Sequence, residues 1–182
     1  MTDPQNAPAP PSAALPSDDL RRALTFAESA GEKSQHLGLV GDTYTILLTG
    51  DHTAGRFCLI DMHIPPGGGP PPHRHDFEET FIVLEGELEA TFRGTKTHVR
   101  ANETIHIPAN ASHQFRNSSV NPVRMLCICS PAGQENFFLE VGVPVPTRTT
   151  PPPKLDEKAQ AAFIQKMVAL APRYKTEILQ HA

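Results

Sequence analysis

Four residues in two segments of the chain have the types and the spacing of a metal site. His73 and His75 are two residues apart, so on an extended chain both side chains point to the same face. Glu79 stands at the start of the next apolar run, and His113 begins another run further along the chain. Three imidazoles and one carboxylate suit Fe, Mn, Ni, Co, Cu or Zn. The sequence therefore predicts one divalent transition metal ion as a cofactor, bound by these four side chains.

The predicted site is open and functional. A structural zinc site is usually closed and rich in cysteine, whereas Cys58, Cys127 and Cys129 lie away from the four residues in the sequence. Four protein ligands on an octahedral ion leave two positions for water, a chelating substrate or dioxygen. Because a chain of 182 residues buries a sizeable core without a metal, the ion is not needed to hold the fold together.

The chain on either side of the ligands favours sharp, stiff turns. Gly67–Gly69 allow the backbone to turn, and Pro70–Pro72 stiffen the approach to His73. If the sheet closes on itself, His113 faces the same interior as the first three ligands. Glu78 is an alternative ligand to Glu79, but the alternation along the strand favours Glu79.

Eight short runs between turn signals have the composition of strands. They are Thr43–Thr49, Arg56–Ile64, Thr80–Leu84, Glu87–Arg93, Glu103–Ile107, His113–Arg116, Val123–Ser130 and Phe137–Val141. Their β-branched and aromatic content and their regular spacing predict an all-β sandwich or barrel. The turn at Glu85 and Gly86 is interpreted as a hairpin. Arg21–Phe26 is interpreted as an early strand, with a helix capped by Ser17 as the alternative.

The two ends of the chain differ in composition from the barrel, which is predicted to occupy residues 20–143. Residues 1–19 are rich in Pro, Ala and Ser, which predicts a mobile tail or one that packs on a partner subunit. Residues 144–153 hold five prolines and form a stiff connector. Apolar residues then recur at helical spacing up to Pro172, so the sequence predicts a helix that covers one face or mouth of the barrel. Tyr174–Gln180 is expected to return as a short strand.

The composition excludes several classes of function. A net charge of -4 does not suit nucleic-acid binding, which usually needs a basic face. No apolar run has the length needed to span a bilayer, and the first residues lack the pattern of a secretory signal. The three cysteines form no C-x-x-C pair. We expect a reduced, cytoplasmic protein with a small-molecule partner and neither a nucleic-acid nor a membrane partner.

The first ligand segment resembles the first cupin motif, G(x5)HxH(x3,4)E(x6)G. Gly67, His73, His75, Glu79 and Gly86 match every fixed position.

The second ligand segment resembles the second cupin motif, G(x5)PxG(x2)H(x3)N. Pro108, His113 and Asn117 match, while Asn102 and Asn110 replace the two glycines. Asn tolerates a positive φ better than most residues, so the second turn is expected to survive this change.

The resemblance covers roughly residues 21 to 180 and is greatest to the single-domain, quercetin-dioxygenase-like cupins. It implies a single cupin jelly-roll barrel with a C-terminal helix, a homodimer, and a metal in the barrel interior held by His73, His75, Glu79 and His113. In such enzymes the ligating glutamate also takes a proton from the substrate hydroxyl, which makes Glu79 the candidate catalytic base.

The resemblance leaves the reaction open, because one barrel hosts many chemistries. The first hypothesis is a dioxygenase that acts on a small enolic or phenolic substrate. The alternative is a non-redox metal cupin, either an isomerase or lyase or a small-ligand binding protein. Acireductone dioxygenase, which uses the same types of ligand, is a third option.

Other side chains have both a structural and a functional interpretation. Residues that share the parity of the ligands are expected to be core and can also line the cavity: Phe81, Val83 and Phe115. Residues expected to lie at the surface or core edge could instead support the ligands: His63 and His106. Cys127 and Cys129 share a strand face and are expected to pack in the core, with a redox role near the barrel interior as the alternative. Phe137 and Phe138 are expected to be core, with a hydrophobic pocket or a dimer contact as the alternative.

Overall fold

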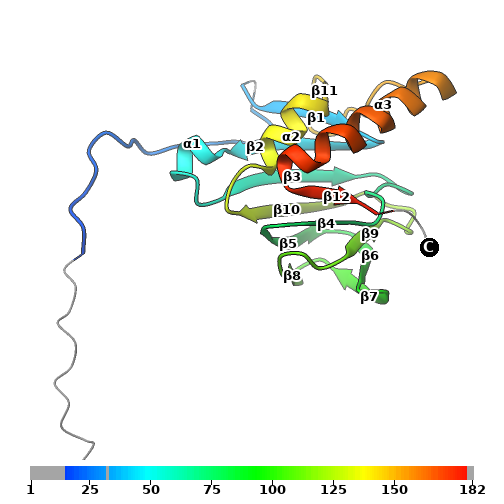
Figure 1. Cartoon of the computed structure of the whole chain (residues 1–182), viewed down its shortest axis with the longest axis horizontal. Coiled ribbons are helices and arrows are strands. Elements are labelled where there is room, and N and C mark those ends of the chain that lie inside the picture. Colours follow the sequence, from blue (N-terminus) through cyan, green and yellow to red (C-terminus); the bar gives the residue numbers. More distant parts are fainter. Residues whose placement is uncertain (1–14, 32, 180–182) are drawn as a thin grey trace, which may run out of the picture.

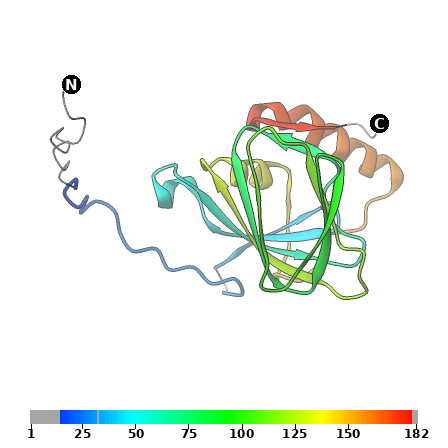
Figure 2. The same ribbon diagram turned by 90° about the horizontal axis from the view of Figure 1, so that it is seen from below.

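The strands form two antiparallel sheets that face each other and close into a barrel (Figures 1 and 2). The structure is a computed structural model, which describes residues 15–31 and 33–179. The larger sheet has the order β11 (Val143–Pro144), β1 (Gln35–Leu39), β2 (Asp42–Leu48), β3 (Cys58–Ile64), β10 (Val123–Ser130), β5 (Glu78–Glu85) and β8 (Thr104–Ile107). The smaller has the order β12 (Thr176–Ile178), β4 (His73–His75), β9 (His113–Arg116), β6 (Glu87–Phe92) and β7 (Thr95–Arg100).

The helices lie outside the sheets, with α2 and α3 beside each other in Figure 1. They are α1 (Gly50–Thr53), α2 (Gln134–Val141), α3 (Glu157–Leu170) and a 3-10 turn at Ala171–Tyr174. The predicted all-β barrel with a C-terminal helix is confirmed, and so is the late strand, which is β12. None of the described helices is long and apolar enough to cross a membrane.

Strict alternation along the central strands fills the barrel interior. In β5 and β10 every second residue is buried, because successive side chains of a strand point to opposite faces. Phe81 of β5 lies opposite Cys127 of β10, and Cys127 lies opposite Ile60 of β3. All three side chains are at most 3% exposed. The row they form is the core beneath the site.

Gly86 is the point where the chain passes from one sheet to the other, so the predicted hairpin is wrong. The strand before it, β5, pairs with β10 and β8, whereas the strand after it, β6, pairs with β7 and β9. Gly86 has a φ of +80°, and a Cβ there would lie 2.7 Å from the carbonyl oxygen of Pro122. The turn was correctly placed, but local sequence does not determine which strands a turn brings together.

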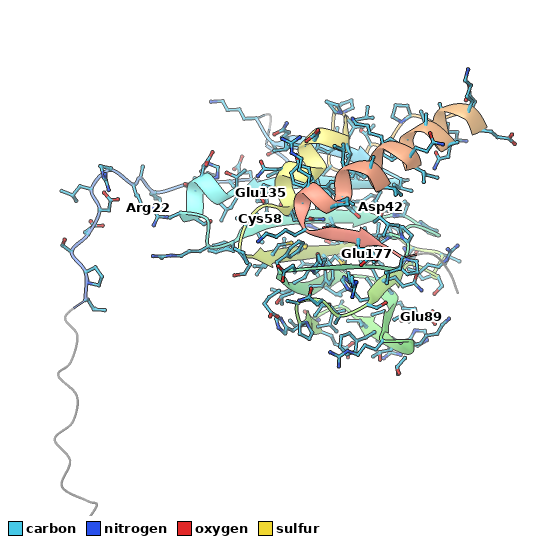
Figure 3. The ribbon with its side chains drawn as sticks, in the orientation of Figure 1. Arg22, Asp42, Cys58, Glu89, Glu135 and Glu177 are labelled. Atoms are coloured by element: carbon cyan, nitrogen blue, oxygen red, sulfur yellow. The ribbon has the colours of Figure 1, made fainter. Side chains whose placement is uncertain are left out.

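The predicted strand Phe137–Val141 is also wrong, because these residues belong to helix α2. The buried residues of α2 are Gln134, Glu135, Phe137, Phe138 and Val141, which is the spacing of one helical face. The carboxylate of Glu135, labelled in Figure 3, accepts hydrogen bonds from the backbone N–H of Gly50 at 2.8 Å and of Gly133 at 2.7 Å. Five residues were too short a window to show this period.

The predicted strand at Arg21–Phe26 is wrong as well, and no helix replaces it. Its side chains find no apolar neighbour to bury them: Leu24 is 97% exposed and Phe26 is 83% exposed. In Figure 1 this segment runs away from the barrel. The mobile tail predicted at residues 1–19 falls for residues 1–14 outside the described part of the chain.

The C-terminal segment returns to the barrel through α3. Asp156 caps this helix by accepting a hydrogen bond from the N–H of Ala159 at 2.8 Å. Met167 and Leu170 pack against the core, whereas Ile164 is 47% exposed. The helix thus covers the barrel with only part of its apolar side. The domain boundary near residue 143 stays a prediction.

Candidate metal centre

Three histidines from the smaller sheet and one glutamate from the larger sheet meet inside the barrel. His73 on β4 lies directly opposite His113 on β9, and His75 follows two residues along β4. Glu79 is on β5 of the other sheet, and all four side chains are buried. One potential ligand atom from each lies within 4.8 Å of all the others. The structure therefore brings together the four residues that the sequence predicted as a metal site.

Each imidazole is oriented by a backbone carbonyl. The Nδ1 atoms of His73, His75 and His113 lie 2.9 Å from the carbonyl oxygens of Pro71, Phe77 and Ala111 respectively. A carbonyl oxygen can only accept, so each Nδ1 carries the proton. Each Nε2 of a neutral ring is then a free lone pair, which is the arrangement usual for histidines that bind metal.

The carboxylate of Glu79 crowds two of these nitrogens. Its Oε2 lies 3.1 Å from Nε2 of His75 and 3.1 Å from Nε2 of His113. When both imidazoles are neutral, with the proton on Nδ1, they have no proton to share with this oxygen, so three lone pairs face one another unless a proton or a cation lies between them. A cation between them would relieve this repulsion. The donor set therefore fits a divalent metal ion.

The charges of the site influence one another strongly. Burial acts to raise the pKa of Glu79, but hydrogen bonds from His113 and His75 outweigh it and hold the pKa well below its usual range. Burial acts to lower the pKa of His113, and the bond to Glu79 raises it above its usual value. Burial and the charge of His113 lower the pKa of His73 to about 4. Glu79 is thus ionised and His73 is a neutral candidate ligand at neutral pH.

Two thiols hold the other oxygen of Glu79. The Sγ of Cys127 donates to Oε1 at 3.2 Å, and the Sγ of Cys129 lies 3.7 Å from the same oxygen. Burial raises the pKa of Cys127 to about 12, so this thiol keeps its proton. The thiols thereby direct Oε2 toward the histidines. All three cysteines are free and buried. The sequence favours core packing for Cys127 and Cys129 and does not predict their contact with Glu79.

Glu79, Cys127 and Cys129 form a second group of potential ligand atoms. Binding there requires the thiols to lose protons that burial stabilises, whereas the histidine group offers lone pairs that are already free. The histidine group is the better metal site for a divalent ion.

The second cupin-like turn survives its two substitutions. Asn102 and Asn110 have φ values of +71° and +65°, the left-handed region in which glycine usually stands. The N–H of Asn110 donates to the carbonyl oxygen of His75 at 2.7 Å, which ties this turn to β4. Asn117 is fully buried, and its Nδ2 donates to the carbonyl oxygen of Ile64 at 3.0 Å. The backbone geometry of the motif is therefore kept.

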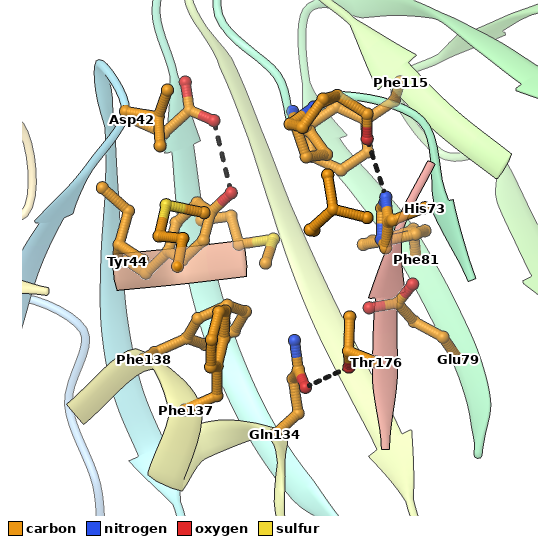
Figure 4. Close-up of a pocket in the computed structure, with 17 residues that line it drawn as sticks. Asp42, Tyr44, His73, Glu79, Phe81, Phe115, Gln134, Phe137, Phe138 and Thr176 are labelled. Atoms are coloured by element: carbon orange, nitrogen blue, oxygen red, sulfur yellow. Dashed lines mark hydrogen bonds between the residues drawn. The ribbon is translucent and has the colours of Figure 1, made fainter. Parts of the chain in front are cut away.

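A cavity of about 60 Å³ opens next to the site (Figure 4). Polar groups contribute little to its wall, and they come from Asp42, Tyr44, His73, Glu79, Gln134 and Thr176. The rest of the wall is apolar: Leu39, Val40, Met62, Pro70, Pro71, Phe81, Phe115, Phe137, Phe138, Met167 and Ile178. A small, mostly apolar molecule in this cavity would lie against the candidate metal site, because His73 and Glu79 form part of the wall.

The structure separates the other residues that the sequence singled out. Phe81 and Phe115 line the cavity as expected, whereas Val83 is buried in the core and does not line the cavity. Glu78 is exposed and pairs with exposed His106 at 2.9 Å, so Glu78 does not replace Glu79. His63 is half-buried and does not line the cavity.

Sequence reasoning missed the polar residues of the cavity wall away from the ligands. Asp42 and Tyr44 stand at the start of β2, and Gln134 begins α2. The alternation along β2 was a signal that Asp42 and Tyr44 share one face, but nothing local indicated that this face meets Glu79.

A family model described as a cupin domain matches residues 60–129, which include all four candidate ligands. The solved structure of an RmlC-like cupin from Shewanella frigidimarina aligns with a TM-score of 0.54 and 16% identity, over 64% of this chain and 99% of that one. The chain belongs to the cupin superfamily. The cupin fold implied by the resemblance of the two motifs is thus confirmed, and the four residues that the resemblance implies as ligands lie together inside the barrel.

Curated relatives of this cupin differ in their activities. Quercetin 2,3-dioxygenase of Bacillus subtilis is 30% identical over 124 residues, which are 67% of this chain and 36% of that protein. Polyketide synthase CurC of Streptomyces cyaneus is 35% identical over 94 residues, which are 50% of this chain and 60% of that protein. The cupin described here therefore spans about a third to three-fifths of the length of these relatives.

Proposed function

We propose that this cupin is a metal-dependent dioxygenase that acts on a small enolic or phenolic substrate. The observation that carries the proposal is the set of three oriented imidazoles and one carboxylate at the wall of an otherwise apolar cavity. His73, His75, Glu79 and His113 would hold the ion. When bound, the ion supplies Lewis acidity and open positions for a chelating substrate and dioxygen.

The electrostatics of Glu79 favour a readily ionised substrate hydroxyl. The low pKa of Glu79 keeps its carboxylate free of a proton, so it can accept one. The same low pKa makes it a weak base, because the histidines stabilise its charged form. An aliphatic hydroxyl would give up its proton too reluctantly, whereas an enol or a phenol matches a weak base better. Glu79 is therefore assigned as the proton acceptor in the proposed reaction.

The cavity limits the size of the substrate. At roughly 10–15 Å³ for each water position, a volume of about 60 Å³ holds about four to six waters. A single six-membered ring needs about the same space. It fills an apolar cavity of roughly 150 Å³ when the whole volume of the cavity is counted, and not only the volume open to the centres of water molecules. The aromatic side chains of Phe81, Phe115 and Phe137 in the wall suit a flat ring.

A larger substrate requires part of the wall to move. A groove of about 500 Å³ lies on the far side of residues that line both spaces: Val40, Pro70, Pro71, Phe115, Met167 and Ile178. A molecule of several rings would reach the ligands only by displacing this wall, in which Met167 is the most adaptable side chain.

The alternative is a non-redox reaction on the same class of substrate, either isomerisation or lyase chemistry, or binding without turnover. The similarity to polyketide synthase CurC supports this alternative, because that name does not indicate an oxygenase. The protein groups described above would serve either reaction, since an oriented chelate and a proton acceptor are common to both. Dioxygen dependence therefore separates the two.

Metal analysis of the purified protein tests the site itself. We expect about one transition metal ion per chain in the wild type, and loss of that metal in Glu79→Ala and His113→Ala. Glu78→Ala and His106→Ala are matched controls, because they remove the same groups from an exposed ion pair outside the cavity. Equal metal contents in all five proteins would refute the assignment.

Oxygen uptake tests the reaction. The metal-loaded protein is incubated with catechol, kojic acid and quercetin under air and under nitrogen, and products are analysed after reaction with ¹⁸O₂. A dioxygenase consumes one O₂ per substrate and places both labelled atoms in the product. Turnover that is equally fast under nitrogen would refute the dioxygenase and support the non-redox alternative.

A further inference from the structure

Asp42 and Tyr44 form a polar point on the cavity wall across from Glu79 (Figure 4). The Tyr44 hydroxyl donates to Oδ2 of Asp42 at 3.2 Å. Asp42 is 2% exposed and Tyr44 is 5% exposed. The Tyr44 ring is fixed by an edge contact with Phe138 at a centroid distance of 5.0 Å. The pair is thus rigid and buried, and it shares the cavity with the metal site.

The hydrogen bonding of this pair is incomplete. Oδ1 of Asp42 is buried against the loop at Gly68, where a Cβ would lie 2.3 Å from it, and it has no hydrogen bond of good geometry among the described residues. The backbone of Gly69 supports the charged form of this carboxyl from the same loop. The Tyr44 oxygen donates its single proton to Asp42 and keeps lone pairs that can accept. Native proteins rarely leave buried polar atoms unpaired, because the loss of hydration is not compensated. The free lone pairs of the Tyr44 oxygen therefore supply the acceptor that a binding site for a polar ligand group requires.

The position of the pair defines the shape of its ligand. Tyr44 is on β2 and Glu79 is on β5, and the larger sheet places β3 and β10 between these strands. At about 4.8 Å per strand spacing, the two backbones are roughly 14 Å apart across the sheet. Apolar side chains such as Met62 and Phe81 line the space between. The cavity is therefore polar at these two points and at Gln134 and Thr176, and it is apolar over the rest of its wall.

We propose that Asp42 and Tyr44 bind a hydroxyl group of the substrate at the end opposite its metal-chelating end. The ligand class is a single ring with a hydroxyketone or diol on one side and a hydroxyl substituent on the other. This inference rests on the proposed function, because it assumes that the chelating end faces the four ligands.

The charge of the pair favours a neutral hydroxyl over a cationic group. Burial raises the pKa of Asp42 to about 7, although hydrogen bonds from Tyr44 and from the backbone of Gly69 oppose this rise. Below that pH the carboxyl is neutral and can both donate and accept. A ligand hydroxyl that donates to the Tyr44 oxygen uses the lone pairs that this oxygen keeps, while Asp42 holds the Tyr44 hydroxyl in place. A site built to bind a hydroxyl also discriminates well against an analogue that lacks it.

Two chelators that differ by one oxygen atom test the proposal. Kojic acid and allomaltol share the same hydroxypyranone ring and chelating group, and kojic acid has a hydroxymethyl group where allomaltol has a methyl group. Their dissociation constants are measured by calorimetry at pH 6 on the cobalt-loaded protein under nitrogen, so no turnover is needed. One additional hydrogen bond predicts that the wild type binds kojic acid about tenfold more tightly than allomaltol.

Tyr44→Phe removes only the hydroxyl. The variant should bind kojic acid and allomaltol about equally tightly, and its affinity for allomaltol should equal that of the wild type. Tyr174→Phe is the matched control, because the hydroxyl of Tyr174 bonds to Glu140 and does not line this cavity. Asp42→Asn is a second variant, with a similar loss expected, and it provides the test if Tyr44→Phe does not fold. A merely structural role would lower the melting temperature without changing the ratio of the two constants.

The outcomes separate this inference from the proposed function. If allomaltol binds but neither chelator is preferred, the Asp42 and Tyr44 site is refuted and the metal site stands. An unchanged preference in Tyr44→Phe refutes the site in the same way. If neither chelator binds to the cobalt-loaded wild type, both the chelating role of the metal site and this inference are refuted.

Discussion

Replacement of Asp42 by Asn should change how the stability of this cupin depends on pH. Burial raises the pKa of Asp42 from 3.8 to about 7 in the folded protein. The folded state therefore binds more protons than the unfolded state between these two values. Stability contributed by the protonated carboxyl is present at low pH and is lost as the pH rises through the folded pKa. Asn is a neutral mimic of the protonated form and lacks this dependence.

The size of the effect follows from the two pKa values. For one group with pKa values of 3.8 unfolded and about 7 folded, proton linkage removes roughly 2.5 kcal/mol of unfolding free energy between pH 5 and pH 8. The full shift corresponds to about 4 kcal/mol at 1.36 kcal/mol per pKa unit. The lower figure applies to the experiment, because part of the transition lies outside that pH range.

Urea unfolding of the metal-free protein, followed by circular dichroism with a thiol reductant present, measures the effect. Free energies of unfolding are determined for the wild type and Asp42→Asn at pH 5, 6, 7 and 8. The stability of the variant relative to the wild type should increase by roughly 2.5 kcal/mol over this range. Other titrating groups are common to both proteins, so their contributions cancel in the difference.

Asp51→Asn at an exposed position is the control for the substitution itself. A constant difference between Asp42→Asn and the wild type from pH 5 to pH 8 would refute the reasoning. It would mean that Asp42 is ionised in the folded protein throughout this range, and that its neutral form has no role in the cavity.

Three further predictions concern the metal and the motif. Cys127→Ala should weaken metal binding about tenfold or more, because Cys127 holds Oε1 of Glu79. In a chelator competition, Cys127→Ser should restore most of the affinity. Equal affinities in the wild type and both variants would contradict this role. Asn117→Ala should lower the unfolding free energy, measured in urea, by about 2–4 kcal/mol. The reason is that Asn117 donates hydrogen bonds to the carbonyl oxygens of Ile64 and Asn121 inside the fold. A loss below about 0.5 kcal/mol would show that these bonds are dispensable. Chelator treatment should lower the melting temperature of the wild type but not of Glu79→Ala. The reason is that a metal present at 100 times its Kd stabilises the folded protein by about 2.7 kcal/mol. An equal decrease in both proteins would place the metal elsewhere.

The candidate ligands could be predicted from the sequence because their geometry is local. His73 and His75 face the same way through strand alternation alone, and the short segment to Glu79 limits where the carboxylate can lie. Asn102 and Asn110 could replace glycine because a left-handed backbone is a property of the single residue. Strands with clear alternation, such as β5 and β10, were predicted for the same reason.

Contacts between distant segments were decided by the tertiary structure alone. The chain passes into the other sheet at Gly86 because β5 and β6, the strands on either side of it, pair with strands that lie far along the chain. Phe137–Val141 is helical because its apolar side has to cover the barrel, and Cys127 reaches Glu79 because β10 pairs with β5. Asp42 faces the metal site across two intervening strands. Sequence spacing determined what the four ligands can bind, while closure of the barrel determined what surrounds them, since only closure brings residues separated in sequence into one cavity.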